Sequence, residues 1–301
     1  MIKIIGFAKT FSPVKLGEEE VSTLEYLIEG NNVYVYEFRN ILPVVQEYGI
    51  DRFIETIKNS KDVKLKDIVG GSREKLGGSW LRIPIKSQIK YRSLKLLPRY
   101  HGGKVLIPGS SIKGAVRTAY LYWSLKKNIG EGMRKLGKSV EDYITEEDLK
   151  LNSVFKNVAV RDVYLDPGVQ VIVKRVGDFR DFPLGVVNKG TDFKIEFIFK
   201  DDKLVGDVRE AIDLFYSDLI NYKLKLESNP EVRRFYESLL KGMKKYGFSF
   251  MQLGFGGGYY SKSVNLLFGG PKRKVKGRGI LVDLEGKIYP LGWVGVKWVK
   301  Q

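Results

Sequence analysis

Cysteine is absent from this sequence of 301 residues, and His101 is its single histidine. Without cysteine the chain has no disulfide bonds and no zinc-ribbon site, and one histidine does not make a histidine metal cluster. We therefore expect no metal and no other cofactor. No apolar run approaches the ~20 residues of a membrane helix, and the N-terminus does not resemble a signal peptide. These absences predict a cytoplasmic protein without a membrane partner.

Acidic residues are missing from two long stretches of the chain. The 56 residues between Glu74 and Glu131 contain twelve Lys or Arg, and the 45 residues between Glu237 and Asp283 contain nine. The net charge of the whole chain is +17, so the remaining 200 residues carry −4. Clustered lysine and arginine favour a polyanion, because each neutralised phosphate releases condensed counterions. The alternative is a solvated, lysine-rich surface on a heat-adapted protein, since this composition is also typical of thermophiles.

The order of strand and helix patterns predicts an α+β fold, an antiparallel sheet backed by helices. The helix over 111–127 has the clearest pattern, because the apolar residues between Ile112 and Trp123 fall on one face. We expect further helices over 41–58, 205–226 and 230–244, and strands over 2–8, 33–36, 158–165, 169–176 and 191–199 and near 279–283 and 291–299.

The segment Ile107–Thr118, with the sequence IPGSSIKGAVRT, is a loop that runs into this helix. Ser110 or Ser111 suits the N-cap, where a side-chain oxygen accepts a hydrogen bond from an otherwise unpaired amide. Lys113 and Arg117 follow on a face away from the apolar stripe, and cations beside free amides suit a bound anion such as phosphate. For this segment a nucleotide-binding P-loop is excluded, because Gly114 is followed by Ala115 and not by the lysine and the serine or threonine that the motif requires. The alternative is a capped amphipathic helix whose cations face water.

A second motif, Leu253–Ser263, has the sequence LGFGGGYYSKS and is followed by a basic run. Glycine lets the backbone approach phosphate and present successive amides to it, and tyrosine rings stack on unpaired bases at ~1–3 kcal/mol each. The alternative is a glycine turn with its tyrosines in the core. The residues that we expect to contact RNA here are Gly254, Gly256, Gly257, Gly258, Tyr259, Tyr260, Ser261, Lys262, Lys272, Arg273, Lys274, Lys276 and Arg278.

Together the two motifs resemble the RAMP proteins of CRISPR systems. A Pro-Gly-Ser-Ser-x-Lys-Gly segment at a helix start and a late glycine-rich loop, here IPGSSIKGAVRTA and LGFGGGYYSKSV, are most similar to subunits of the type III-A (Csm) effector complex. Among these the sequence most resembles the family of the fifth Csm subunit, which caps the backbone at the 3′ end of the guide RNA. The opening IGFAKTFSPVKLGEEE resembles the first strand and loop of that family.

The resemblance implies a ferredoxin-like, RRM-type antiparallel sheet core with helical insertions, in one RAMP unit over 1–301. It places the core at about 1–40, 105–200 and 246–301 and the helical insertions at 41–70 and 205–245. It also implies binding of CRISPR RNA, docking on a neighbouring Csm backbone subunit and the small subunit, and maturation of the guide 3′ end through recruited host nucleases. Within the family, contacts to RNA or to subunits are made by the helix start, here Ser110 to Arg117, and by the glycine-rich loop.

The resemblance also bears on catalysis. Backbone subunits of the family cleave target RNA with an aspartate in the loop after the first strand. The matching stretch here, Ser12–Val21, holds Glu18, Glu19 and Glu20 but no aspartate, so we expect no catalytic residue and no enzymatic activity. Two alternatives stay open. One is the RAMP endoribonuclease that processes the CRISPR precursor, with His101 as general base; the other is a plain single-stranded RNA-binding module.

Overall fold

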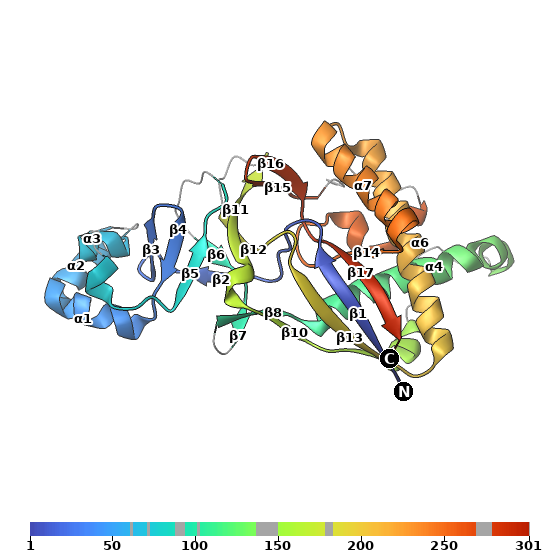
Figure 1. The fold of residues 1–301 in the computed structure, drawn as a ribbon, viewed down its shortest axis with the longest axis horizontal. Coiled ribbons are helices and arrows are strands. Elements are labelled where there is room, and N and C mark those ends of the chain that lie inside the picture. Colours follow the sequence, from blue (N-terminus) through green and yellow to red (C-terminus); the bar gives the residue numbers. More distant parts are fainter. Residues whose placement is uncertain are drawn as a thin grey trace.

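The computed structural model describes residues 1–60, 63–70, 73–87, 94–100, 103–136, 150–177, 183–268 and 279–300. The molecule is elongated (Figure 1), with a small helical lobe at one end and a sheet with long helices at the other. Further sheets connect the two ends.

A five-stranded antiparallel sheet forms the centre of the larger end. Its order is β14 (Ser249–Gln252), β17 (Trp293–Lys300), β1 (Ile2–Thr10), β13 (Asp192–Phe199) and β9 (Val158–Val160). Side chains alternate along β1, because successive residues of a strand point to opposite faces. Ile4 and Ala8 are buried, whereas Lys3, Phe7 and Lys9 are exposed. One face of the sheet therefore belongs to the core and the other faces solvent.

Helices α4 (Gly109–Leu136), α6 (Asp202–Leu226) and α7 (Pro230–Tyr246) contribute to the same hydrophobic core as this sheet. The predicted apolar stripe of α4 is buried there, as Ile112 and Val116 show. Chain order β1–α4–β9–β13–α6–β17 with sheet order β17-β1-β13-β9 is that of a ferredoxin-like unit, with α7 and β14 inserted before the last strand. The predicted α+β class is confirmed.

Two sheets lie between the ends. A six-stranded sheet has the order β16 (Lys287–Pro290), β15 (Leu281–Leu284), β11 (Gln170–Val176), β12 (Pro183–Val187), β6 (Leu94–Leu96) and β2 (Glu19–Val21). A three-stranded sheet has the order β10 (Val163–Leu165), β8 (Lys104–Ile107) and β7 (Arg99–Tyr100). Short 3₁₀ turns are η1 (Arg73–Leu76), η3 (Pro167–Val169), η4 (Tyr259–Lys262) and η5 (Val264–Phe268).

The lobe at the far end has its own hydrophobic cluster. It consists of the sheet β3 (Tyr26–Glu29), β4 (Asn32–Val35) and β5 (Leu81–Pro84) with helices α1 (Phe38–Tyr48), α2 (Ile50–Asn59) and α3 (Leu65–Val69). The single helix expected over 41–58 is two helices, because Gly49, with φ of 98°, ends the first and starts the second. The division of the chain into a RAMP core and helical insertions stays a prediction.

The single strand expected over 158–165 is also two strands. β9 pairs with β13, whereas β10 pairs with β8 in another sheet, so the chain changes sheets between Val160 and Val163.

Candidate nucleic-acid interface

The two motifs, far apart in the sequence, meet at one cleft of about 290 Å³. Helix α4 contributes residues from its first three turns, and the glycine-rich loop with η4 contributes the rest of the lining. The lining residues are Ser110, Ser111, Gly114, Ala115, Thr118, Gln252, Gly254, Ser261 and Lys262. We call this feature the α4 cleft.

The start of α4 differs from the predicted serine cap. The helix begins at Gly109, so Ser110 and Ser111 lie inside its first turn and line the α4 cleft. The Gly109 amide donates instead to the Asp162 carboxylate at 2.7 Å. A Cβ at Gly109 would lie 2.2 Å from the Val160 carbonyl oxygen, so glycine allows this close approach. The N-cap prediction was wrong, because a carboxylate from a later loop supplies the acceptor.

The glycine-rich loop needs glycine for its backbone conformation. Gly254, Gly256 and Gly258 have φ of 74°, 93° and 83°, values that favour glycine. At Gly254 an added Cβ would lie 2.0 Å from the carbonyl oxygen of Lys15. That same oxygen accepts from the Phe255 amide at 2.7 Å, which ties the loop to the segment after β1.

Two buried lysines lie beneath this loop. Lys223 of α6 donates through Nζ to the Gly257 carbonyl oxygen at 2.7 Å, and Lys15 donates to the Leu96 carbonyl oxygen at 2.8 Å. Burial lowers the pKa of each ammonium to about 8, and for Lys223 the charge of Glu227 partly opposes this shift. Neither role was predictable, because nothing in the residue pattern around a lysine distinguishes a buried ammonium from a solvated one.

The tyrosine pair divides between core and surface. Tyr260 is 5% exposed and its ring centre lies 4.6 Å from that of Tyr222. Tyr259 is 39% exposed, and its hydroxyl contacts the amide of Asn265. The expectation that both rings are available to bases is wrong for Tyr260, which packs in the core; only Tyr259 presents a ring to solvent.

The predicted cations do not all reach the α4 cleft. Lys262 is exposed and lines it, whereas Lys113 and Arg117 are half-buried on α4 outside the lining. The basic run Lys272, Arg273, Lys274, Lys276 and Arg278 lies outside the residues that the structure describes, as does His101.

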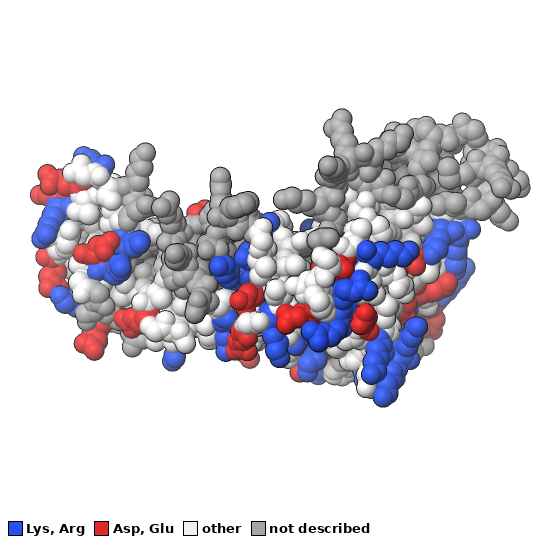
Figure 2. Space-filling view, turned by 90° about the horizontal axis from the view of Figure 1, so that it is seen from above, with Lys and Arg blue, Asp and Glu red and all other residues white. Residues whose placement is uncertain are grey.

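Much of the first acid-free window is neutralised by acidic residues from other parts of the chain. The window therefore does not form one unpaired basic surface. On the face shown in Figure 2, basic and acidic side chains are interspersed, and basic ones are most frequent on the half away from α1–α3. The ion pairs join Lys86 to Glu285, Lys95 to Glu18, Arg99 to Glu19, Lys126 to Asp218 and Lys127 to Glu210, at 2.6 to 3.1 Å.

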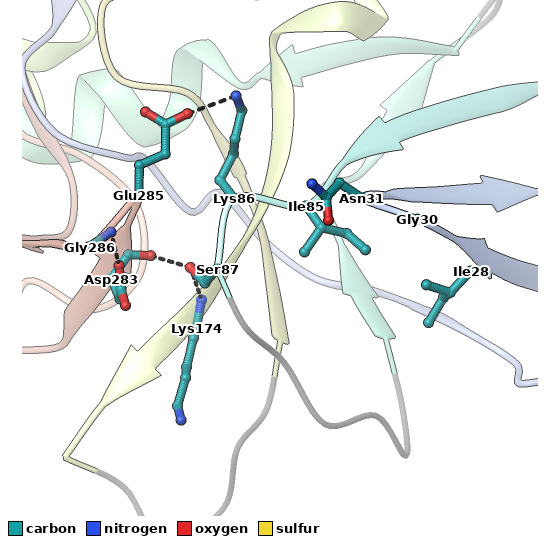
Figure 3. Close-up of a pocket in the computed structure, with 10 residues that line it drawn as sticks. All are labelled: Ile28, Gly30, Asn31, Ile85, Lys86, Ser87, Lys174, Asp283, Glu285 and Gly286. Atoms are coloured by element: carbon teal, nitrogen blue, oxygen red, sulfur yellow. Dashed lines mark hydrogen bonds and ion pairs between the residues drawn. The ribbon is translucent and has the colours of Figure 1, made fainter.

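A larger hollow of about 850 Å³ lies between the β3–β4 and β15–β16 turns (Figure 3). Several of its polar groups are engaged with one another. Lys86 pairs with Glu285, and the Ser87 hydroxyl donates to the Asp283 carbonyl oxygen at 2.5 Å while it accepts from the Lys174 amide at 3.1 Å. No residue of the two motifs lines it. The α4 cleft is therefore the better candidate for an anionic ligand.

Among the described residues, no group of three His, Cys, Asp or Glu side chains is placed to hold a metal ion. Within the same residues, no helix has the length and apolar character to cross a membrane. Two of the glutamates after β1 take part in ion pairs, Glu18 with Lys95 and Glu19 with Arg99.

Comparison with known proteins adds to this geometry. A family model described as "RAMP superfamily" matches residues 92–261. The "CRISPR system Cms protein Csm5" of Methanocaldococcus jannaschii is 26% identical, over 84% of this chain and 71% of that protein. A chain in a "Csm-crRNA-target RNA ternary complex in type III-A CRISPR-Cas system" has a TM-score of 0.77 at 20% identity, covering 99% of this chain and 100% of that one. The crystal structure of T. onnurineus Csm5 gives a TM-score of 0.71 at 20% identity, covering 96% and 99%.

Proposed function

This chain belongs to the RAMP superfamily, whose model matches more than half of its residues, and from that membership we propose that it is a non-catalytic guide-RNA-binding subunit of a type III-A Csm complex. We further propose that it caps the complex's backbone at the 3′ end of the guide, supports guide maturation and serves antiviral defence. The similarity to Csm5 proteins, first inferred from the motifs, is confirmed by the comparisons and supports this assignment.

The observation that carries the proposal is the meeting of both motifs at the α4 cleft. The amino end of a helix favours an anion, and hydroxyls of Ser110 and Ser111 lie in its first turn. The positive charge of Lys262 and the backbone at Gly254 line the same cleft. These are the groups that bind a phosphate of an RNA backbone without reading its sequence.

The proposed partners follow from the family. They are CRISPR RNA, the neighbouring Csm backbone subunit, the small subunit and recruited host nucleases, in the cytoplasm. The ion pairs of Glu18 and Glu19 support a chain without nuclease activity, because a carboxylate held by a cation is poorly placed to activate a hydroxyl.

Substitution of Lys262 tests the RNA site. We expect Lys262→Ala, and the double change Ser110→Ala with Ser111→Ala, to weaken binding of guide RNA in filter-binding titrations. Loss of one phosphate contact should also lower the slope of log affinity against log salt by about 0.7. Lys66→Ala, which removes an exposed lysine from α3 in the far lobe, is the matched control.

An unchanged affinity and salt slope in the Lys262 variant would contradict the site. The same preparations, incubated with labelled precursor RNA, should leave it intact. Cleavage products that depend on His101 would favour the precursor-processing endoribonuclease instead.

A further inference from the structure

The solvent face of the five-stranded sheet carries an exposed aromatic ring at its middle. Phe7 of β1 is 46% exposed, whereas its neighbours Gly6 and Ala8 are buried on the core side. β1 is the central strand, between β17 and β13. A large apolar ring at such a position has no packing role in the core, because it points away from the helices.

The register places a lysine on each side of this ring. Phe7 pairs with Lys194 of β13 and with Lys297 of β17, so all three side chains leave the same face. The Lys194 Nζ lies 5.4 Å from the centre of the Phe7 ring, and the Lys297 Nζ lies 4.8 Å from that of Phe248. A hollow of about 400 Å³ is lined by Phe7, Ala8, Lys9, Asp192, Phe193, Lys194, Phe248 and Lys297. The Asp192 carboxylate in this lining is paired with Lys9 at 3.3 Å.

The charge of this face favours an anionic partner. In the part of the chain that the structure describes, Lys194 and Lys297 contact rings but form no ion pair. By contrast, Lys3 and Arg161 on the same face both pair with Glu196, at 2.8 Å each. Two uncompensated cations thus flank an exposed ring, a combination that suits the stacked base and the phosphates of a single strand.

We propose that this sheet face is a second RNA site, in which one unpaired base of single-stranded RNA stacks on Phe7 while Lys194 and Lys297 hold the adjacent phosphates. The site rests on the proposed function, since the RNA is taken to be the one bound at the α4 cleft. The two sites share no lining residue. Aromatic residues on the central strands of a four-stranded sheet stack bases in this way in RNA-recognition domains. A protein partner is the less favoured occupant, because burying two unpaired ammonium groups against it is costly.

Affinity and crosslinking with the full chain test this site. Phe7→Ala should weaken binding of single-stranded guide RNA by about ten-fold, because one stacking contact is lost. Phe7→Tyr, which keeps the ring, should retain wild-type affinity, and Lys194→Gln with Lys297→Gln should lower the salt dependence. Guide RNA with 5-iodouridine should crosslink to the peptide that contains Phe7. Phe38→Ala is the matched control, since Phe38 is 60% exposed on α1 in the far lobe.

Thermal unfolding of each variant separates lost binding from lost folding, and the crosslink on unchanged protein does not depend on any variant. If Phe7→Ala binds as tightly as Phe38→Ala and the crosslink is absent while Lys262→Ala weakens binding, the sheet-face site is wrong and the α4 cleft stands. If the wild-type chain binds no guide RNA, both proposals fail. If Phe7→Ala keeps its RNA affinity but loses association with another Csm subunit, the face is a protein interface and the proposal is overturned.

Discussion

Two single glycines, Gly114 and Gly206, both lie in helices but at different distances from the proposed RNA site. Gly114 lines the α4 cleft and Gly206 lies on α6 away from it, and an added Cβ meets nothing within 4 Å at either. Each change to alanine should raise the free energy of unfolding by about 0.5–1 kcal/mol, because the unfolded chain loses conformational freedom. Only Gly114→Ala should weaken RNA binding, since its methyl group narrows the cleft. Equal affinities of the two variants would argue that RNA does not enter there; thermal unfolding and filter binding measure both effects.

The buried ammonium of Lys223 makes stability depend on pH. Its pKa is about 8 in the folded chain and 10.5 when exposed, so between these values the unfolded state binds more protons. The free energy of unfolding should therefore rise as the pH increases through about 8 towards 10. Lys223→Met should remove this part of the rise and should also leave the Gly257 carbonyl unpaired, at a cost of about 1–3 kcal/mol.

Urea titrations from pH 7 to pH 9 measure the effect, because most exposed tyrosine, with a pKa of about 10, is still protonated in that range. Lys225→Met is the control, because Lys225 is exposed on the same helix. A pH profile of Lys223→Met that parallels the wild type would show that the burial of this amine does not govern the slope. Lys15 should contribute a second, separate rise of the same sign.

Among the helices and strands, the first turn of α4 depends on Asp162, whose carboxylate accepts from the Gly109 amide. Asp162→Ala should lower the free energy of unfolding by about 1 kcal/mol, because the Gly109 amide loses its acceptor. Asp162→Asn keeps an acceptor oxygen but removes a negative charge beside the α4 cleft, so it should be more stable than the alanine variant and bind RNA at least as tightly as wild type. Chemical denaturation and RNA titration check the pair. An alanine variant as stable as wild type would exclude this capping role.

Local sequence patterns predict some helices and strands of this fold but not their ends or their sheet partners. The helix over 111–127 was predictable because one apolar face repeats along it, but its first residue was not, since its capping carboxylate comes from Asp162 and not from the local serines. Strand β12 was missed because all five of its residues are buried, so the alternation that identifies a half-buried strand is absent. The break between β9 and β10 depends on pairing with two different sheets, which no local pattern records.

Across the molecule, we expect lysines without an acidic partner, and not ion-paired lysines, to determine the salt dependence of RNA binding. A triple variant of the ion-paired lysines Lys86, Lys95 and Lys127 to Gln removes the same charge as a triple variant of Lys194, Lys262 and Lys297 to Gln. We expect only the second to lower the salt slope of RNA binding, by about 2 for three lost phosphate contacts. Equal slopes for the two triple variants would mean that net charge alone, and not the identity of the lysines, governs affinity.

These ion pairs between residues distant in the sequence also show which part of the candidate site was predictable. The sequence indicated both motifs, because glycine, serine and lysine in those orders have local meaning. It did not indicate that Lys86 or Lys95 would lie against Glu285 or Glu18, which are distant in the sequence. Nor did it separate Tyr259 from Tyr260, because burial of one ring depends on Tyr222 of α6.

The lobe over residues 24–85 holds nine basic and nine acidic residues, so the whole excess of +17 resides in the rest of the elongated chain. Such a body has a large electric dipole along its length. A nearby polyanion exerts a torque on this dipole and turns the positive end of the protein toward the polyanion before any contact forms. Added salt should accordingly lower the association rate constant far more than it raises the dissociation rate constant. In the bound state the neutral lobe should point away from the nucleic acid.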